Sequence, residues 1–396
     1  MKRSATVSRQ GNQPLSRMLH VKPFPCPGAW PISEFVWRRE EWMPEPQVPR
    51  SGQRTLGATI RDVAQRAGVS QSTVSRVINE RGYVSDQTRR RVLEAARALN
   101  FRPNFLARSL VQKSTRTLGL VIPDITNPFF PAIVRGVEDA AARAGYTVLL
   151  THTDDDPHRE AEAVVQLRER WVDGMIIAPQ AYQTSHLHDL VHSGVPTVFI
   201  DRVPPRLNVD AVSSDNEHGA WLAVRHLVEL GHRCIAHVAG PKTSPTAQAR
   251  LRGYQRALAE AGISFKRDLV FEGGFRFEGG VYAAKQLLNR RPRPTAVFAA
   301  NDLMALGVLH ATTEAGVEVP HELAVVGFDD ILPAVLVSPP LTTVAQNSYD
   351  LGARAVELLL DRISGRWQGP GRHVIVSPRL VVRGSCGGRQ GGTADG

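Results

Sequence analysis

The sequence is poor in cysteine and has no long apolar run. Its 396 residues include three cysteines, Cys26, Cys234 and Cys386, which are odd in number and far apart. This spacing excludes a disulfide framework and a cysteine metal site, and it is typical of proteins in a reducing compartment. No apolar run reaches the roughly 18 residues that a transmembrane helix requires, and the N-terminal segment lacks the apolar region of a secretory signal. We therefore expect a cytoplasmic protein without a membrane span.

Residue groups typical of catalysis or metal binding are also missing. The stretch GGFRFEGG does not match a phosphate-binding glycine loop, and neither a nucleophile elbow nor an H-E-x-x-H motif occurs. The adjacent Asp154, Asp155 and Asp156 precede a predicted helix, where carboxylates usually cap the helix and favour its dipole. His186 and His188 have no third ligand at zinc spacing. We expect no enzymatic activity, no cofactor and no metal ion.

Basic residues are concentrated in one part of the chain. Residues 58–116 hold 12 basic and four acidic residues, a net charge of +8, whereas residues 117–396 hold 27 and 30, a net charge of -3. A basic segment beside a slightly acidic body suits a nucleic-acid partner. Residues 1–57 carry a net charge of +5 and show no sustained period. We predict a disordered extension there, with weak nonspecific DNA affinity; a start codon assigned too far upstream would account for it.

The segment 58–103 has the apolar period of three short helices. Gly68 supplies a turn between the first two, and Ser70 can cap the second. Ser85 can cap a third helix that runs to Leu99, around which the adjacent residues 89–91, all Arg, would fan out. The first two helices form a predicted helix-turn-helix. The predicted buried faces are Ile60, Val63, Ala64 and Ala67, then Val74, Val77 and Ile78, then Val92, Leu93, Ala96 and Leu99.

From Thr117 onward, short apolar runs alternate with amphipathic stretches, which predicts βαβ units with buried parallel strands. The eight runs are LGLVI, TVLLTH, GMIIAP, TVFID, IAHVAG, LVFEG, AVFAAN and LAVVGF. Two sets of strands suggest two lobes. Ligands of open α/β sheets bind beyond the carboxyl ends of the strands. Polar residues at these ends are Asp124, Asn127, Asp201, Arg202, Asn301, Asp302 and Asp329.

Three motifs in order, TIRDVAQRAGVSQSTVSRVIN, RPNFLARSL and PDITNPFF, resemble the LacI/GalR family of bacterial transcriptional regulators. The resemblance covers residues 58 to about 385. It implies an all-α helix-turn-helix DNA-binding headpiece at 58–103, followed by a hinge helix and linker at 104–116. An α/β two-lobed periplasmic-binding-protein-like domain with parallel sheets would occupy 117–386, with a disordered tail at 387–396. The chain would cross between the lobes near Asp215, Ala345 and His373.

The second helix carries polar residues opposite its apolar face, where Arg76 could read guanine and Gln71 adenine in the major groove. The resemblance implies a hinge helix from Asn104 to Val111 that forms when two subunits meet on DNA. Leu110 would then enter the minor groove as a wedge; alternatively, it packs against its dimer mate. The predicted DNA-binding residues are Thr59, Ser70, Gln71, Ser72, Thr73, Ser75, Arg76, Asn79, Arg108 and Leu110.

The resemblance also implies an effector site between the lobes. Its predicted residues are Asn127, Phe129, Phe130, Asp201, Thr246, Arg250, Phe275, Asn301, Asp329 and Gln346. Carboxylates and amides suit paired hydroxyl groups, and an aromatic ring suits the C–H face of a pyranose, so a sugar is the expected effector. An Arg and an Asp can equally bind a purine or an anion. Asn127 and Gln346 could instead be strand-end caps or inter-lobe hinges.

The predicted function is that of a homodimeric DNA-binding transcriptional repressor. It would bind a pseudo-palindromic double-stranded operator with an affinity controlled by a small ligand, for which a sugar is the expected class. Closure of the cleft would alter the separation of the two hinge segments. A purine- or other metabolite-responsive regulator of the same architecture is one alternative. A soluble sugar-binding protein and an enzyme fused to a DNA-binding module are alternatives from other classes. Whether the ligand releases or tightens DNA, and whether the protein is a dimer or a tetramer, stays open.

Overall fold

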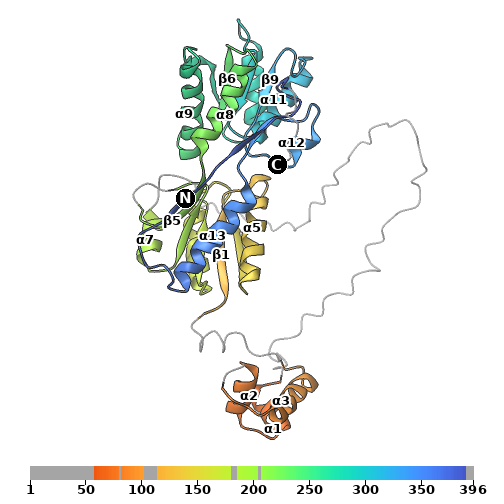
Figure 1. Ribbon diagram of the computed structural model, residues 1–396, viewed down its shortest axis with the longest axis vertical. Helices are drawn as coiled ribbons and strands as arrows, with labels where there is room; N and C mark the ends of the chain where they lie inside the picture. The colour runs from red at the N-terminus through yellow and green to blue at the C-terminus, as the bar shows by residue number, and fades with distance from the viewer. Residues whose placement is uncertain (1–57, 80–81, 102–113, 180–184, 204–206, 389–396) are drawn as a thin grey trace, which may run out of the picture. The chain divides into compact units, whose positions relative to one another are not determined.

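The computed structural model describes residues 58–79, 82–101, 114–179, 185–203 and 207–388. The chain divides into two compact units, residues 1–102 and 103–396 (Figure 1). The predictions for the N-terminal extension and the hinge helix, including Arg108 and Leu110, lie outside the described residues. Most of the predicted tail lies outside them as well.

The described part of the first unit consists of three helices, α1 (Ile60–Ala67), α2 (Gln71–Ile78) and α3 (Asp86–Ala98). Thr59, Ser70 and Ser85 cap them, as their hydroxyl oxygens accept backbone N–H groups of the first turns. Gly68 has a φ of 64°, the left-handed conformation that ends α1 and allows the tight joint to α2. The helix-turn-helix prediction is confirmed. The buried core is Val63, Ala64, Ala67, Val74, Val77, Val92, Ala95 and Ala96.

The predicted inward face of α3 is wrong at one residue. The side chain of Leu93 is 38% exposed, while Ala95 is buried. From Val92, the spacing of three, four and seven residues leads to Ala95, Ala96 and Leu99, whereas Leu93 is rotated by about 100° from Val92.

In the second unit, lobe 1 is built on a six-stranded parallel sheet with the order β11-β5-β4-β3-β1-β2. Its helices include α5 and α13, which pack together. Gly136 and Gly352 allow this close approach, because a Cβ on Gly136 would lie 2.1 Å from the carbonyl oxygen of Tyr349. The strands are β1 (Thr117–Ile122), β2 (Thr147–His152), β3 (Gly174–Ile177), β4 (Thr197–Ile200), β5 (Asp210–Ser214) and β11 (His373–Val376). The helices are α5 (Phe129–Arg143), α6 (Pro157–Glu169), α7 (Ser185–His192) and α13 (Ser348–Ile363).

Lobe 2 is built on a four-stranded parallel sheet with the order β7-β6-β8-β9. Its strands are β6 (Ile235–Ala239), β7 (Val270–Glu272), β8 (Ala296–Ala299) and β9 (Ala324–Val326). Its helices are α8 (Asn216–Glu229), α9 (Pro245–Glu260), the 3-10 turn η1 (Arg267–Leu269), α10 (Phe277–Leu288), α11 (Asp302–Glu314) and the short α12 (Pro333–Leu336). All eight predicted strands are therefore present, distributed between two parallel sheets.

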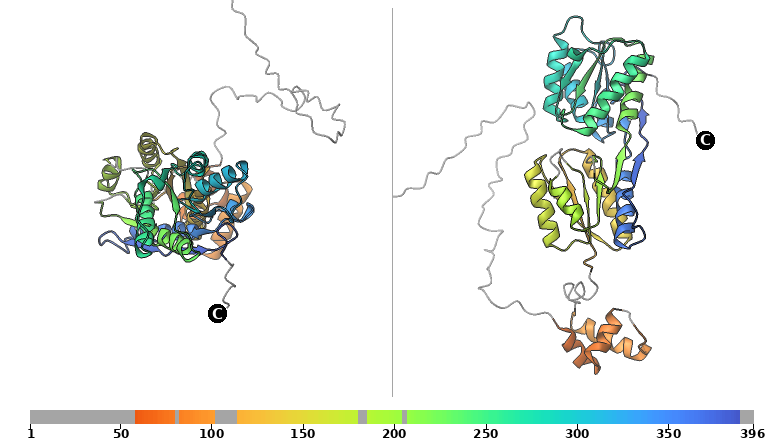
Figure 2. Two further views of the ribbon diagram at one scale, coloured as in Figure 1. Left: turned by 90° about the horizontal axis from the view of Figure 1, so that it is seen from above. Right: turned by 90° about the vertical axis from the view of Figure 1, so that its left-hand side faces the viewer.

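Three crossings join the lobes along one side of this unit (Figure 2, right). The first lies at Asp215, between β5 and α8, and the second follows Ala345, between β10 (Thr343–Ala345) and α13. The third lies between β11 and β12 (Arg379–Val381), a few residues beyond the predicted His373. Strands β10 and β12 pair in antiparallel fashion. The carboxyl ends of both parallel sheets consequently face the space between the lobes.

Candidate functional site

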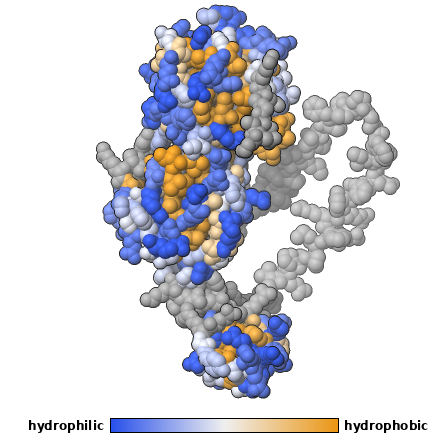
Figure 3. Space-filling view, in the orientation of Figure 1, coloured by the Kyte–Doolittle hydropathy of each residue, from blue (hydrophilic) through white to orange (hydrophobic). Residues whose placement is uncertain are grey.

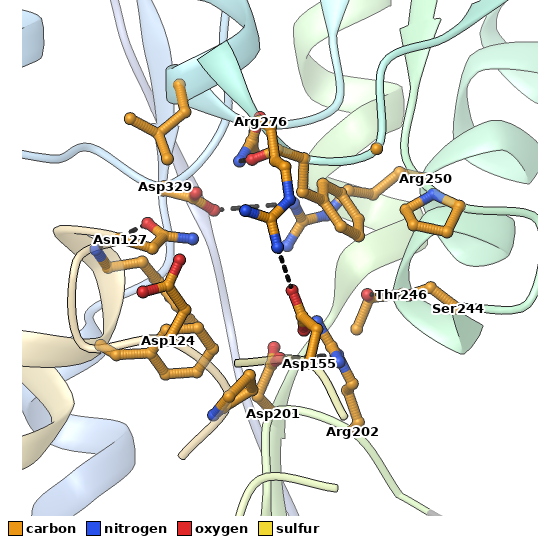
Figure 4. A pocket seen from close by; sticks show the side chains of 18 of the residues that line it. Asp124, Asn127, Asp155, Asp201, Arg202, Ser244, Thr246, Arg250, Arg276 and Asp329 are labelled. Carbon is orange, nitrogen blue, oxygen red and sulfur yellow. Dashed lines mark hydrogen bonds and ion pairs between the residues drawn. The ribbon is translucent and has the colours of Figure 1, made fainter. Parts of the chain in front are cut away.

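A cavity of about 360 Å³ lies between the two lobes (Figure 4). Nine of the ten residues predicted for the effector site line it, and Gln346 is the exception. Lobe 1 contributes residues from the loops after β1, β2 and β4, and lobe 2 contributes residues from the loops after β6, β7, β8 and β9. The remaining lining residues are Pro123, Asp124, Asp155, Arg202, Pro241, Thr243, Ser244, Gly274, Arg276 and Leu303.

Arg250 and Asp329 form the buried centre of this cavity. The Arg250 Nη1 lies 3.6 Å from the Asp329 Oδ1, and both side chains are about 95% buried. Arg250 Nε donates to the Asn216 Oδ1 at 2.8 Å, Nη1 also donates to the carbonyl of Ala300, and the guanidinium lies 3.8 Å from the ring centre of Phe328. Burial raises the pKa of Asp329 well above its usual value, and the neighbouring Arg250 opposes that rise. The geometry fixes a charged donor beside a carboxylate acceptor.

Gln346 contacts Asp329 of this pair but does not line the cavity. Its side chain is fully buried, and Nε2 donates to the Asp329 Oδ1 at 2.6 Å. It follows β10 at the second crossing between the lobes, which agrees with the alternative interpretation of Gln346 as a hinge residue. The structure thus places Gln346 as a residue that positions the Asp329 carboxylate, outside the cavity lining.

The two predicted amides are partly used by the backbone. Asn127 Oδ1 accepts the N–H of Phe129 at 3.1 Å, and Asn301 Oδ1 accepts the N–H of Met304 at 3.0 Å as the cap of α11. Asn301 Nδ2 donates to the carbonyl of Phe275 at 3.0 Å. Both amides still line the cavity, so each combines a capping role with a position at the ligand space.

Three phenylalanines supply the apolar surface of the cavity. Phe129 and Phe130 begin α5 and meet edge to face, with ring centres 5.1 Å apart. Phe275 approaches from lobe 2 over Gly240, where a Cβ would lie 2.3 Å from the Phe275 ring. Apolar rings on both lobes and charged groups between them are suited to a ligand with apolar faces and polar edges.

The interpretation of residues 154–156 as helix caps holds for Asp156 alone. Asp156 is the cap of α6 and accepts the N–H of His158 at 2.8 Å, and Asp154 pairs with Arg159. Asp155 instead lines the cavity and lies 3.4 Å from the Arg276 Nη2 of lobe 2. Burial raises the pKa of Asp155 above its usual value, with Arg202 and Arg276 opposing the rise. Its place directly after a parallel strand is the signal that could have revealed it.

The described residues contain no group of three or more side chains suited to a metal ion. His186, discounted as a zinc ligand, has its Nε2 2.7 Å from the Oε1 of the buried Glu160. In the same part of the chain, no helix is both long and apolar enough to cross a membrane.

The predicted DNA-binding residues of the first unit fall into two groups. Gln71, Ser72 and Arg76 are exposed on α2, although the Ser72 hydroxyl lies 2.8 Å from that of Ser70. The others are engaged locally: Thr59 and Ser70 cap helices, Ser70 bonds to the Thr73 hydroxyl at 2.9 Å, and Asn79 Nδ2 donates to the Ser75 Oγ at 3.2 Å. Tyr83, which the sequence reasoning did not single out, is 93% exposed just before α3.

A three-helix unit with a helix-turn-helix and a separate two-lobed unit with a central cavity define a DNA-binding transcriptional regulator of the ligand-responsive kind. Comparison with known proteins names the family. The model of bacterial regulatory proteins of the lacI family matches residues 59–104, and that of the periplasmic binding protein-like domain matches residues 224–386. The chain belongs to the LacI family, whose members are transcriptional regulators rather than enzymes.

Similar proteins support this assignment over most of their length. The HTH-type transcriptional repressor PurR of Mannheimia succiniciproducens is 38% identical over 82% of this chain and 98% of the relative. The structure of the lac repressor dimer bound to operator and the anti-inducer ONPF has a TM-score of 0.75 and 33% identity, covering 83% of this chain and 99% of that one. A LacI family transcriptional regulator from Enterococcus faecium with bound ribose has a TM-score of 0.63 and 33% identity, covering 68% and 98%.

Proposed function

We propose that the protein is a homodimeric repressor whose operator affinity is controlled by a neutral sugar bound in the cavity between the lobes. One observation carries the choice of ligand. The lining contains Arg202, Arg250 and Arg276, and each lies within 4 Å of a carboxylate from Asp201, Asp329 and Asp155 respectively. With Asp124 included, the lining holds four carboxylates against three guanidinium groups. Because each guanidinium already has a carboxyl partner within the site, this lining favours a neutral ligand over a phosphate or carboxylate.

Paired acceptors and donors suit vicinal hydroxyl groups. A hydroxyl can donate to the carboxylate of Asp329 while accepting from Arg250, and Asp201 with Arg202 offers the same combination from lobe 1. A site whose buried polar groups are satisfied by hydroxyl groups rejects analogues that lack them. The bound ribose of the Enterococcus faecium regulator supports a monosaccharide of this size class.

We infer that α2 reads the operator through Arg76 and Gln71, since their exposed side chains can reach base edges. The other predicted DNA-binding residues of this unit would position α2 against the phosphates. The hinge helix at 104–111 and the minor-groove wedge at Leu110 remain predictions. Because its partner is an operator, we expect the protein to act in the cytoplasm.

We propose that lobe 2 contributes α12 to a dimer interface with a second copy of the chain. This helix exposes Leu332 (72%), Val335 (51%) and Leu336 (74%), and Figure 3 shows hydrophobic surface at its position. Three neighbouring exposed aliphatic side chains are typical of an interface. The dimer of the operator-bound lac repressor supports the same state here. Ligand-driven closure would then change the relative position of the two subunits in the dimer, and this change would alter operator affinity.

Calorimetric titration of the full chain with D-ribose, D-ribose 5-phosphate and adenine tests the ligand class. We expect saturable binding of the neutral sugar and no comparable binding of its phosphate. The bound sugar should change the dissociation constant for a selected palindromic operator, because effector and operator affinities are thermodynamically linked. Preferential binding of the phosphate would refute the charge argument, and preferential binding of adenine would establish the purine-responsive alternative.

A further inference from the structure

An ion pair at the rim of the cavity joins the two lobes directly. Arg276 belongs to lobe 2, at the start of α10, and Asp155 belongs to lobe 1, in the loop between β2 and α6. The Arg276 Nη2 donates to the Asp155 Oδ2 at 3.4 Å across the space between them (Figure 4). The two residues are 121 positions apart in sequence. The contact therefore exists only while the lobes are close together.

Unusual backbone conformations hold both partners in place. Asp154 and Asp155 have φ values of 53° and 61°, and Gly274 and Phe275, directly before Arg276, have φ values of 64° and 63°. Left-handed backbone is uncommon for residues other than glycine, above all for a bulky side chain such as that of Phe275. Such conformations persist where the surrounding structure requires them, and they are frequent at ligand sites. Each lobe thus presents its charged group from a tightly turned loop.

Helix capping does not account for either side chain. Arg276 occupies the cap position of α10 but makes no side-chain capping bond, and arginine is not among the preferred capping residues. In the acidic loop, Asp156 caps α6 and Asp154 pairs with Arg159 within lobe 1. Of the three carboxylates, Asp155 is the one directed to the opposite lobe.

We propose that the Asp155–Arg276 pair is a latch that holds the lobes closed over the cavity and slows the escape of a bound ligand. The ligand part of this inference rests on the proposed function, whereas the closing part does not. Both side chains remain partly exposed, at 41% for Asp155 and 60% for Arg276. Solvent screens such a pair, so its effect on the closed fraction is about two- to fivefold. The latch therefore raises the population of the closed form modestly, and the open form remains accessible.

Hydrogen exchange of the ligand-free full chain tests the latch without any effector. The variants are Asp155→Asn, Arg276→Gln and the double variant. Asparagine tolerates left-handed backbone as well as aspartate does, so Asp155→Asn removes charge without added strain. We expect each single variant to raise amide exchange about two- to fivefold in cavity loops of both lobes, residues 123–130 and 240–246. The double variant should exchange no faster than the faster single variant, because both changes remove one interaction.

Asp154→Asn is the matched control. Like Asp155→Asn, it removes one negative charge from this loop at a residue with left-handed backbone. Asp154, however, pairs with Arg159, which belongs to the same lobe. We expect this variant to leave exchange in residues 240–246 unchanged. Additive effects of the two latch substitutions, or no effect on lobe 2, would overturn the latch.

Stopped-flow dissociation of D-ribose supplies the ligand readout. We expect Asp155→Asn and Arg276→Gln to raise the dissociation rate by the factor seen in exchange, and Asp154→Asn to leave it unchanged. Equal dissociation from all four proteins would refute ligand retention by the latch. If the unsubstituted chain does not bind D-ribose, the sugar proposal fails, and the exchange experiment alone decides whether the lobes are latched.

Discussion

The helix-turn-helix unit and the cavity unit place their functional side chains in opposite ways. In the first, the candidate base-reading residues belong to the single eight-residue helix α2 and are exposed. In the second, Asp201 and Asp329 follow strands and Arg250 belongs to helix α9, so the three come from segments far apart in sequence, and each is at least 93% buried. An exposed helix can meet a large partner with little change of shape. A cavity lined by two lobes instead surrounds a small partner, and its lining depends on the distance between the lobes.

The two units also differ in how much apolar surface they bury. The core of the first unit consists of eight valine and alanine side chains, whereas the larger unit buries Tyr254, Phe199, Phe298 and Phe328 completely. Small cores leave little stability in reserve. We therefore expect substitutions in the first unit to remove DNA binding by unfolding it, and substitutions in the cavity to alter ligand response in a folded protein.

Val74→Asp should have the largest effect. Val74 is fully buried between the three helices, and a carboxylate there would have no partner, which costs about 4 kcal/mol or more. We expect the first unit to unfold and operator binding to be lost, while sugar binding remains. Calorimetric unfolding measures the stability of the first unit, and titrations with operator and with sugar measure the two binding activities. Loss of sugar binding in the same variant would mean that the two units do not fold independently.

Arg250→Met should have the next largest effect, in the cavity unit. Removing one partner of a buried pair costs about 3 to 5 kcal/mol. Because the pKa of Asp329 is already raised, protonation of this carboxyl would relieve part of the cost. We expect ligand affinity to fall by about 3 kcal/mol, with little change in ligand-free operator affinity. Titration calorimetry measures this loss. Arg252→Met, on the same helix but 56% exposed, is the control and should bind ligand normally.

The contrast between the units also explains what the sequence could predict. Helix caps and apolar spacing are local, so α1, α2 and α3 were predicted from adjacent residues, with Leu93 as the error. The eight strands with strong apolar runs were found in the same way. Strands β5, β10, β11 and β12 were not predicted, because they are short or polar and form where the chain crosses between lobes. Their pairing depends on tertiary structure and leaves no period in the sequence.

For the cavity, a position after a strand and the family resemblance sufficed for nine lining residues. Gln346 shows the limit of this reasoning, since its contact with Asp329 places it behind the lining. Asp155 was assigned to a helix cap because three adjacent carboxylates are locally equivalent. Only the arrangement of the lobes distinguishes the one that meets Arg276, and Arg276 itself had no sequence signal.

Arg76→Ala tests whether an exposed side chain of α2 contributes to operator binding without contributing to the stability of the first unit. If Arg76 reads a base, the substitution should cost about 1 to 3 kcal/mol on the selected operator and little on random DNA. The unit should stay folded, because Arg76 is exposed and outside the core. Fluorescence anisotropy with both DNAs measures the two affinities. An equal loss on operator and random DNA would make Arg76 a phosphate contact instead.

Asp62→Asn should have the smallest effect, confined to the first unit and dependent on pH. The backbone N–H and the hydroxyl of Thr59 donate to the Asp62 carboxylate and lower its pKa below 3.8. Because the folded-state pKa is the lower one, the stabilisation is present above about pH 4 and is lost as the pH falls through the folded-state value. We expect the variant to be less stable at neutral pH and less sensitive to acid. Calorimetry of the first unit's transition between pH 2 and 7 tests this against Glu94→Gln, which removes one charge from α3. An unchanged acid dependence in Asp62→Asn would show that the capping box does not contribute to the stability of this small core.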